Sequence, residues 1–309
     1  MSRCSHPVYA LDRGIKENGK RNIKILPRRA DLYSYQQLSE RYGKGSIIAL
    51  PCGKCLACRI NKSKDWAVRC CLEASCYDDN YFVTFTYSDD KLPGDLKLHR
   101  EHLTDFIKRL RHYYPGVRYF GCGEYGSRTK RPHYHLILFN FPIKDLRCVS
   151  KGSLGGYYYE SKQLEKIWSH GNILIGEVSY SSCAYVARYA TKKLYGSPSN
   201  DEFICMSTKP GLGYTWLQDH FDIFDKDVIC GPFGSSKVSK IPRYFEKVFE
   251  NIDYFGCLSL LKDQRICKSE AKTLNTMIQH GFSEVEKMYQ FEGTVLEKEF
   301  SDSKRRKDL

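Results

Sequence analysis

The sequence from residue 131 to residue 139 reads RPHYHLILF, and this stretch decides the fold. Its aliphatic and aromatic residues predict a strand from His133 to Phe139. Side chains two apart on a strand point to the same face, so His133 and His135 lie side by side, roughly 6.5–7 Å apart along the backbone, with Tyr134 on the opposite face. Two such imidazoles can bind one cation. The alternative is a hydrogen-bonded pair on an ordinary strand.

A carboxylate stands just upstream, in the segment GCGEYG of residues 121–126. Glu124 ends the preceding strand, and a hairpin would bring it beside the two imidazoles. The flanking glycines allow a ligand or another backbone to approach closely. Two neutral nitrogens and one carboxylate leave positions for phosphate oxygens, which favours magnesium or manganese over the zinc that imidazole alone would suit. The alternative for Glu124 is an exposed turn carboxylate.

The neighbouring segments alternate between strands and helices. Strands are predicted at residues 82–87, 117–124 and 172–178. Apolar residues at helical spacing predict helices around 103–110, from 164 to a stop at Gly171, and from 182 to 194. The order β-α-β-β-α-β indicates an α+β fold, a ferredoxin-like split βαβ antiparallel sheet with helices covering one face.

Further helices and the domain limits follow from the flanking sequence. We expect a helix over 59–77 and a mainly helical chain beyond Pro242, with 258–288 as an appended helical segment. The predicted domains are 1–80 with a cysteine cluster and a helix, 81–245 with the sheet, and 246–309 with helices and a basic tail.

A second candidate motif is YVARYATKK at residues 185–193. On a helix, Tyr185 and Tyr189 lie on one face about one turn, or ~5–6 Å, apart. A phenol with a pKa of about 10 is a poor nucleophile at neutral pH. The nearby cations Arg188, Lys192 and Lys193 can stabilise the phenolate. The alternative is core packing of two aromatic rings.

Together the two motifs describe a reaction on a phosphodiester. A divalent ion on His133, His135 and Glu124 would polarise the ester, and a tyrosine would attack phosphorus to leave a covalent intermediate. The composition fits a polyanionic partner, because 49 Lys and Arg against 36 Asp and Glu give a net charge of +13. The 23 tyrosines and 16 phenylalanines also offer stacking surfaces for bases.

The cysteines predict a second metal site. Cys52, Cys55 and Cys58 repeat the spacing Cys-x-x-Cys, which suits structural zinc but leaves a fourth ligand to be supplied. The candidates for that ligand are Cys4, His6, Cys70 and Cys71. Alternatively, the three cysteines are small hydrophobic residues on one helix face. No secretion signal or run of about 20 apolar residues is found, which predicts a reducing interior and no membrane partner.

These motifs resemble those of the HUH endonuclease superfamily. The segments PCGKCLACR (51–59), DWAVRC (65–70) and MSTKPGLG (206–213) are more closely similar to replication initiation proteins of gokushovirus-type microviruses. The likeness runs from about 51 to 245 and leaves the tail after Phe249 unmatched. It implies an HUH nuclease palm, nicking of the viral origin through a 5′-phosphotyrosine, and a 3′-hydroxyl that primes rolling-circle synthesis. By resemblance, Tyr185 and Tyr189 are the nucleophiles and His133 and His135 the metal ligands, with Glu124 as a third ligand at a position that varies.

The resemblance also implies the partners. The viral origin, single-stranded or in the replicative form, is the expected substrate, and the host bacterial cytoplasm the expected location. The segment GIKENGKR (14–21) has Arg21 where a phosphate-binding loop needs a hydroxyl residue, so we expect a host helicase and a host polymerase as partners. Rival hypotheses are a zinc-stabilised, non-enzymatic binder of single-stranded nucleic acid, and a transposase or plasmid relaxase of the same superfamily.

Overall fold

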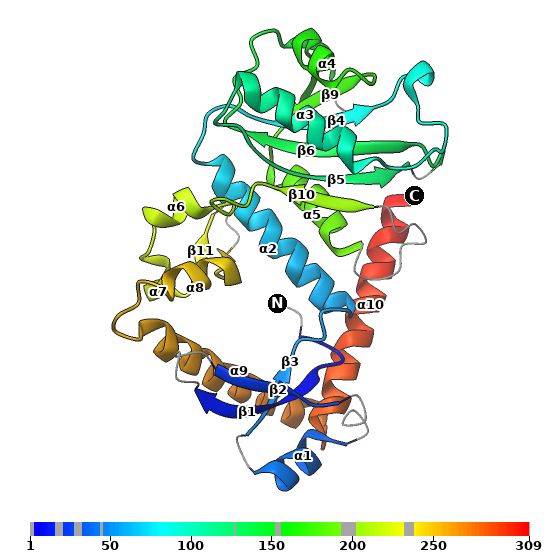
Figure 1. Cartoon of the computed structure of the whole chain (residues 1–309). Coiled ribbons are helices and arrows are strands. Elements are labelled where there is room, and N and C mark those ends of the chain that lie inside the picture. Colours follow the sequence, from blue (N-terminus) through cyan, green and yellow to red (C-terminus); the bar gives the residue numbers. More distant parts are fainter. Residues whose placement is uncertain are drawn as a thin grey trace. The chain divides into compact units, whose positions relative to one another are not determined.

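The computed structural model describes residues 3–15, 21–27, 33–43, 46–126, 128–151, 156–192, 202–231 and 238–308, with the backbone alone at 15, 21, 189–192 and 304–308 (Figure 1). The chain divides into two compact units. One comprises residues 62–258, which we call the sheet unit, and the other comprises residues 1–61 with 259–309, which we call the terminal unit. Most of the segment 14–21 lies outside the described residues.

A seven-stranded sheet forms the centre of the sheet unit, in the order β10-β5-β6-β4-β9-β8-β7 (Figure 1). Its strands are β4 Asn80–Thr86, β5 Arg118–Tyr125, β6 Pro132–Phe139, β7 Arg147–Lys151, β8 Tyr157–Glu160, β9 Ile173–Glu177 and β10 Phe203–Met206. All neighbouring strands are antiparallel. The central order β5-β6-β4-β9, with helix α3 after β4 and helix α4 before β9, confirms the predicted α+β fold and its split βαβ strand order.

Strand β6 is buried on both faces, and this decides how the helices are arranged. Tyr134, Leu136 and Leu138 face a core closed by α3 (Arg100–Tyr113) and α4 (Lys162–Trp168). Ile137 and Phe139 face a second core closed by α2 (Leu56–Ala74) and α5 (Tyr180–Lys192). The prediction that helices cover one face is therefore wrong, because alternate side chains of this strand are apolar on both sides and both need cover.

Two helix ends differ from the prediction. Helix α2 begins three residues earlier than expected and ends at Ala74. Helix α4 ends at Trp168, because Ser169 takes a left-handed conformation with φ 65° before Gly171 is reached. Gly171 instead lies where a Cβ atom would come within 2.3 Å of the Ser88 backbone nitrogen. The last residue of the predicted helix 182–194 lies outside the described residues.

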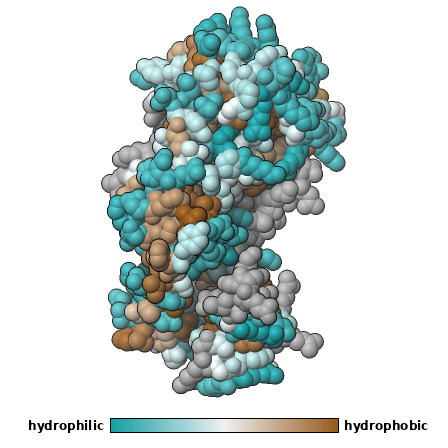
Figure 2. Space-filling model, turned by 60° about the vertical axis from the view of Figure 1, so that its left-hand side comes forward, coloured by the Kyte–Doolittle hydropathy of each residue, from teal (hydrophilic) through white to brown (hydrophobic). Residues whose placement is uncertain are grey.

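The remaining described elements of the sheet unit are short. They are a 3-10 turn at Asp89–Lys91, α6 Tyr214–Gln218, α7 Ile223–Lys226, β11 Ile229–Cys230, β12 Val238–Ser239 and α8 Arg243–Phe249. Figure 2 shows hydrophilic residues over most of the visible surface of this unit.

The terminal unit joins the two ends of the chain. Its sheet has the order β2-β1-β3. Its elements are β1 Val8–Ile15, β2 Arg21–Ile25, α1 Tyr35–Tyr42, β3 Ile47–Leu50, most of α9 Cys257–His280, and α10 Val285–Asp308. The Tyr9 hydroxyl and the Tyr35 backbone N–H both donate to Glu286 of α10, at 2.6 and 2.5 Å. Helices α9 and α10 confirm the helical character predicted beyond Pro242. No helix in the described part of the chain is long and apolar enough to cross a membrane.

Candidate active site

The register of the β5–β6 hairpin places the predicted cation ligands together. Glu124 pairs with His133, and Cys122 pairs with His135. The hairpin is closed where the Gly126 N–H donates to the Arg131 carbonyl at 2.9 Å. Because side chains two apart share a face, the carboxylate and both rings lie on the same face of the sheet, while Tyr134 points into the opposite core.

One carboxylate oxygen is the meeting point of this site. Glu124 Oε1 lies 3.0 Å from His133 Nε2 and 2.9 Å from His135 Nε2. The three ligand atoms lie within 4.8 Å of one another, and Glu124 is only 3% exposed. A buried carboxylate needs charged or hydrogen-bonding neighbours, and here these are two imidazoles and a phenol.

The hydrogen bonds of His133 define what its second nitrogen can do. Nδ1 lies 3.2 Å from the Arg131 carbonyl oxygen, which can only accept, so Nδ1 carries a proton. In a neutral ring Nε2 then carries a lone pair directed at the Glu124 carboxylate. Two lone pairs facing each other repel, so the contact requires either a proton on Nε2 or a cation between the two atoms.

His135 is held in the same way from the neighbouring strand. The Thr84 hydroxyl of β4 lies 2.9 Å from its Nδ1, and in the tautomer with a proton on Nδ1 this hydroxyl accepts the hydrogen bond. Buried Nε2 makes no hydrogen bond with a described residue, despite its closeness to Glu124. Burial lowers the pKa of His135, which favours the neutral ring that binds metals. These donors fit a divalent cation.

Helix α5 brings Tyr185 to the same carboxylate. The Tyr185 hydroxyl donates to Glu124 Oε1 at 3.1 Å. Its ring meets His135 edge-on, with centroids 5.2 Å apart, and Phe82 at 6.2 Å. The Arg188 guanidinium carbon lies 5.2 Å from the centre of the Tyr185 ring. The phenol and the candidate cation ligands therefore form one site.

The other predicted catalytic residues are not fully described. Tyr189 lies one turn after Tyr185 in α5, and its side chain and that of Lys192 lie outside the described residues. Lys193 lies outside them altogether.

Two features of the site were not predicted. Thr84, which holds His135, belongs to a strand 51 residues away in sequence, and only the β4–β6 register would have indicated it. The glycines around Glu124 have a different use from the expected room for a ligand. A Cβ at Gly121 would lie 2.5 Å from the His135 carbonyl oxygen, and one at Gly123 would lie 2.8 Å from the Phe203 ring.

The cysteine motif gathers elsewhere, in the terminal unit. Cys52 and Cys55 precede α2 and Cys58 is in its first turn, so the three do not line one helix face. Cys4 joins them, whereas the other candidate fourth ligands do not. His6 is exposed, and Cys70 and Cys71 are part of the core beneath the sheet.

Comparison with known proteins gives the family. Residues 80–194, which contain the whole site, match the family model of the replication-associated protein ORF2. The chain is 37% identical over 265 residues to replication-associated protein ORF2 of Spiroplasma virus 4, covering 80% of each. It is 35% identical over 229 residues to replication-associated protein VP4 of Bdellovibrio phage phiMH2K, covering 70% of this chain and 71% of that one. The chain belongs to this family of microvirus replication-associated proteins.

A further relative extends the similarity. The chain is 35% identical over 240 residues to replication-associated protein ORF4 of Chlamydia phage 1, covering 72% of this chain and 57% of that one. No solved structure matches the chain significantly. The predicted resemblance to microvirus replication proteins is confirmed by these relatives.

Proposed function

We propose that this protein initiates rolling-circle replication of viral DNA by cutting and rejoining one strand at the origin through a phosphotyrosine. Membership of the replication-associated family supports a role at viral DNA. The observation that carries the chemistry is the shared contact at Glu124 Oε1, where the Tyr185 hydroxyl and two imidazoles meet within about a hydrogen bond's length.

The cation would bind to Glu124, His133 and His135. Magnesium or manganese held there would polarise the scissile phosphodiester and stabilise the charge that develops on it. His133 and His135 would present neutral nitrogens, with Thr84 and the Arg131 carbonyl fixing the rings. In the absence of DNA, Glu124 orients the Tyr185 hydroxyl by accepting its hydrogen bond.

Tyr185 is the proposed nucleophile. Its oxygen attacks phosphorus, the bond from phosphorus to the 3′ oxygen breaks, the phenol loses its proton, and the released 3′ oxygen gains one. The downstream strand is then attached to the protein through its 5′ phosphate, and the free 3′-hydroxyl primes synthesis. The Arg188 charge beside the ring favours the phenolate. The reverse reaction rejoins strands without an external energy source.

The second tyrosine and the lysines complete the proposal. Tyr189, one turn further along α5, would accept the second strand while Tyr185 is occupied. Lys192 and Lys193 would supply positive charge for the phosphate. The reaction would take place in the host bacterial cytoplasm, with a host helicase unwinding the duplex and a host polymerase extending the primer.

The test is formation of a covalent adduct. Single-stranded oligonucleotides that tile the viral genome carry a label at the 3′ end, because the fragment downstream of the cut stays on the protein. With manganese, one oligonucleotide should yield a labelled species that migrates with the protein on a denaturing gel, and EDTA should prevent this. Tyr185→Phe combined with Tyr189→Phe should abolish the adduct.

Tyr180→Phe is the matched control, since Tyr180 begins the same helix but packs in the core beneath the sheet. It should form the adduct at the wild-type yield. An undiminished adduct in the double variant would refute the assignment. Tight binding without any adduct, in any metal, would favour the rival hypothesis of a non-enzymatic nucleic-acid binder.

A further inference from the structure

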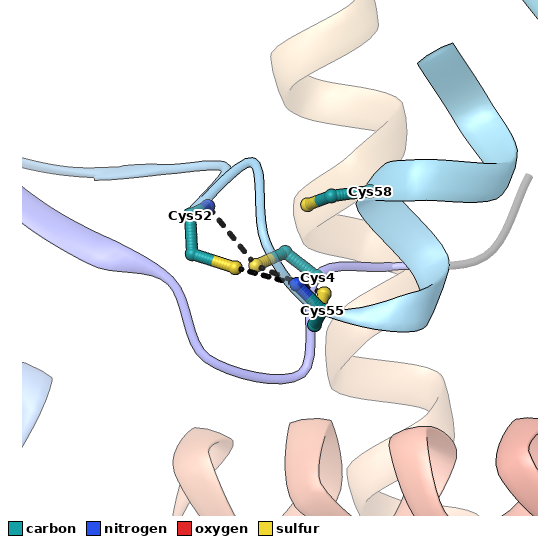
Figure 3. Close-up of side chains that lie close together, drawn as sticks. All are labelled: Cys4, Cys52, Cys55 and Cys58. Carbon is teal, nitrogen blue, oxygen red and sulfur yellow. Dashed lines mark hydrogen bonds between the residues drawn. The ribbon is translucent and has the colours of Figure 1, made fainter. Parts of the chain in front are cut away.

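Four cysteine sulfurs converge in the terminal unit (Figure 3). Cys4 comes from the segment before β1, Cys52 and Cys55 from the loop between β3 and α2, and Cys58 from the first turn of α2. Their four Sγ atoms lie within 4.8 Å of one another, and all four cysteines are free thiols. Figure 3 shows the Cys58 side chain extending from the helix toward the other three. Residues separated by up to 54 positions, from Cys4 to Cys58, thus surround one point.

The spacing matches the edge of a tetrahedral zinc site. Zinc–sulfur bonds of about 2.3 Å place the sulfurs of a tetrahedral site about 3.8 Å apart. The Sγ atoms of Cys4 and Cys55 are 3.8 Å apart. This separation is far longer than the roughly 2.05 Å of a disulfide bond. The geometry fits a single ion between thiolates better than oxidised pairs.

Backbone N–H groups are directed at two of the sulfurs. The N–H groups of Lys54 and Cys55 both donate to Cys52 Sγ at 3.3 Å, and the Cys52 N–H donates to Cys4 Sγ at 3.2 Å. A neutral thiol is a weak acceptor, whereas a thiolate attracts several donors. Four thiolates around a dication carry net negative charge, and these amides would offset part of it.

We propose that Cys4, Cys52, Cys55 and Cys58 bind one structural zinc ion that fastens the N-terminal segment to the start of α2. With four protein ligands the site has no open position, so its role is stability and not catalysis. The need is physical, because the small core of this unit centres on Tyr9, Leu26, Leu38 and Ile47. Small cores commonly depend on a metal or on disulfides.

The test is the zinc content of the full-length protein purified without chelators, measured by inductively coupled plasma mass spectrometry. We expect one zinc per chain in the wild type, with loss of most of it in Cys4→Ser. Cys4→His, which offers another zinc ligand, should restore it. Cys148→Ser is the control, because Cys148 is exposed on β7 of the other unit. His133→Ala combined with His135→Ala should retain one zinc, which separates this ion from the candidate active site.

Cobalt substitution makes the test independent of whether Cys4→Ser folds. The wild-type protein loaded with Co²⁺ should show intense thiolate-to-cobalt charge-transfer bands and the visible bands of tetrahedral cobalt. Weak octahedral bands, bound iron in place of zinc, or full zinc content in soluble Cys4→Ser would each overturn the proposal. The result does not depend on DNA nicking, so the two proposals can fail separately.

Discussion

The Glu124 carboxylate shows how much of the candidate site depends on single side chains. One of its oxygens meets His133, His135 and Tyr185, which come from the hairpin strand and from α5. The two rings are not free to turn, because each has its Nδ1 held by a partner outside the cation site. Ligands whose orientation is fixed in advance bind metal more tightly than mobile ones.

Thr84 is the position where this orienting effect can be measured. Thr84→Val keeps the shape but removes the hydroxyl at His135 Nδ1. Loss of such a contact weakens metal affinity by roughly 10–100-fold, so the manganese concentration for half-maximal adduct formation should rise by that factor. The titration compares it with Thr86→Val, whose hydroxyl instead donates to the Asn172 carbonyl. An equal rise in both variants, or none in Thr84→Val, would contradict the role of Thr84.

At the scale of elements, a buried ion pair connects α2 to the sheet. Glu73 of α2 has a fully buried side chain that accepts from Arg118 of β5 and, at 2.6 Å, from the Gly213 backbone N–H. Gly213 has φ +80°, and a Cβ there would lie 2.7 Å from the Phe245 ring. The segment 206–213, noted in the sequence as a family motif, therefore includes the turn that packs against this helix.

Removing Glu73 should cost far more than removing a surface carboxylate. Glu73→Ala leaves Arg118 without its partner at a site where its side chain is only 12% exposed. Breaking a buried pair costs about 3–5 kcal/mol of the free energy of unfolding. Glu160→Ala, which breaks a pair with the 70%-exposed Arg147, should cost about 1 kcal/mol or less. Urea unfolding of both variants checks this, and equal losses would refute the argument.

The same elements show what the sequence could and could not predict. Strand β6 and helix α3 carry strong apolar periodicity, and both were predicted to within two residues at each end where a boundary was given. Strand β7 is exposed at all five positions and carries no such signal. The hairpin spacing was enough to place Glu124 beside the two histidines. Thr84 and Cys4 lie far in sequence from the residues they join, so only the folded chain places them.

At the scale of the whole molecule, charge is the property that bears most on the partner. The net charge of +13 attracts the phosphate backbone whatever the base sequence. Hydrophobic residues are also exposed, among them Leu260, Leu274 and Ile278 of α9. Positive charge predicts binding that depends on salt, whereas contacts through apolar surface do not weaken in this way.

Single-stranded DNA binding should therefore fall steeply with salt. A site with about five phosphate contacts gives a slope near −3.5, or roughly 100-fold weaker binding from 50 to 200 mM NaCl. Fluorescence anisotropy with a labelled oligonucleotide measures this. The control is an uncharged peptide nucleic acid of the same sequence, which should bind weakly at every salt concentration. Affinity that changes less than about twofold would contradict an electrostatic interface.

The central claim is that a phenol of α5 acts at the cation site of the sheet, and peptide mapping of the adduct tests it most directly. The wild-type adduct, formed with manganese, is digested with nuclease and protease and analysed by tandem mass spectrometry. We predict a nucleotide on the oxygen of Tyr185, or of Tyr189 in molecules that have passed the strand on. A nucleotide on any residue outside α5 would contradict the account.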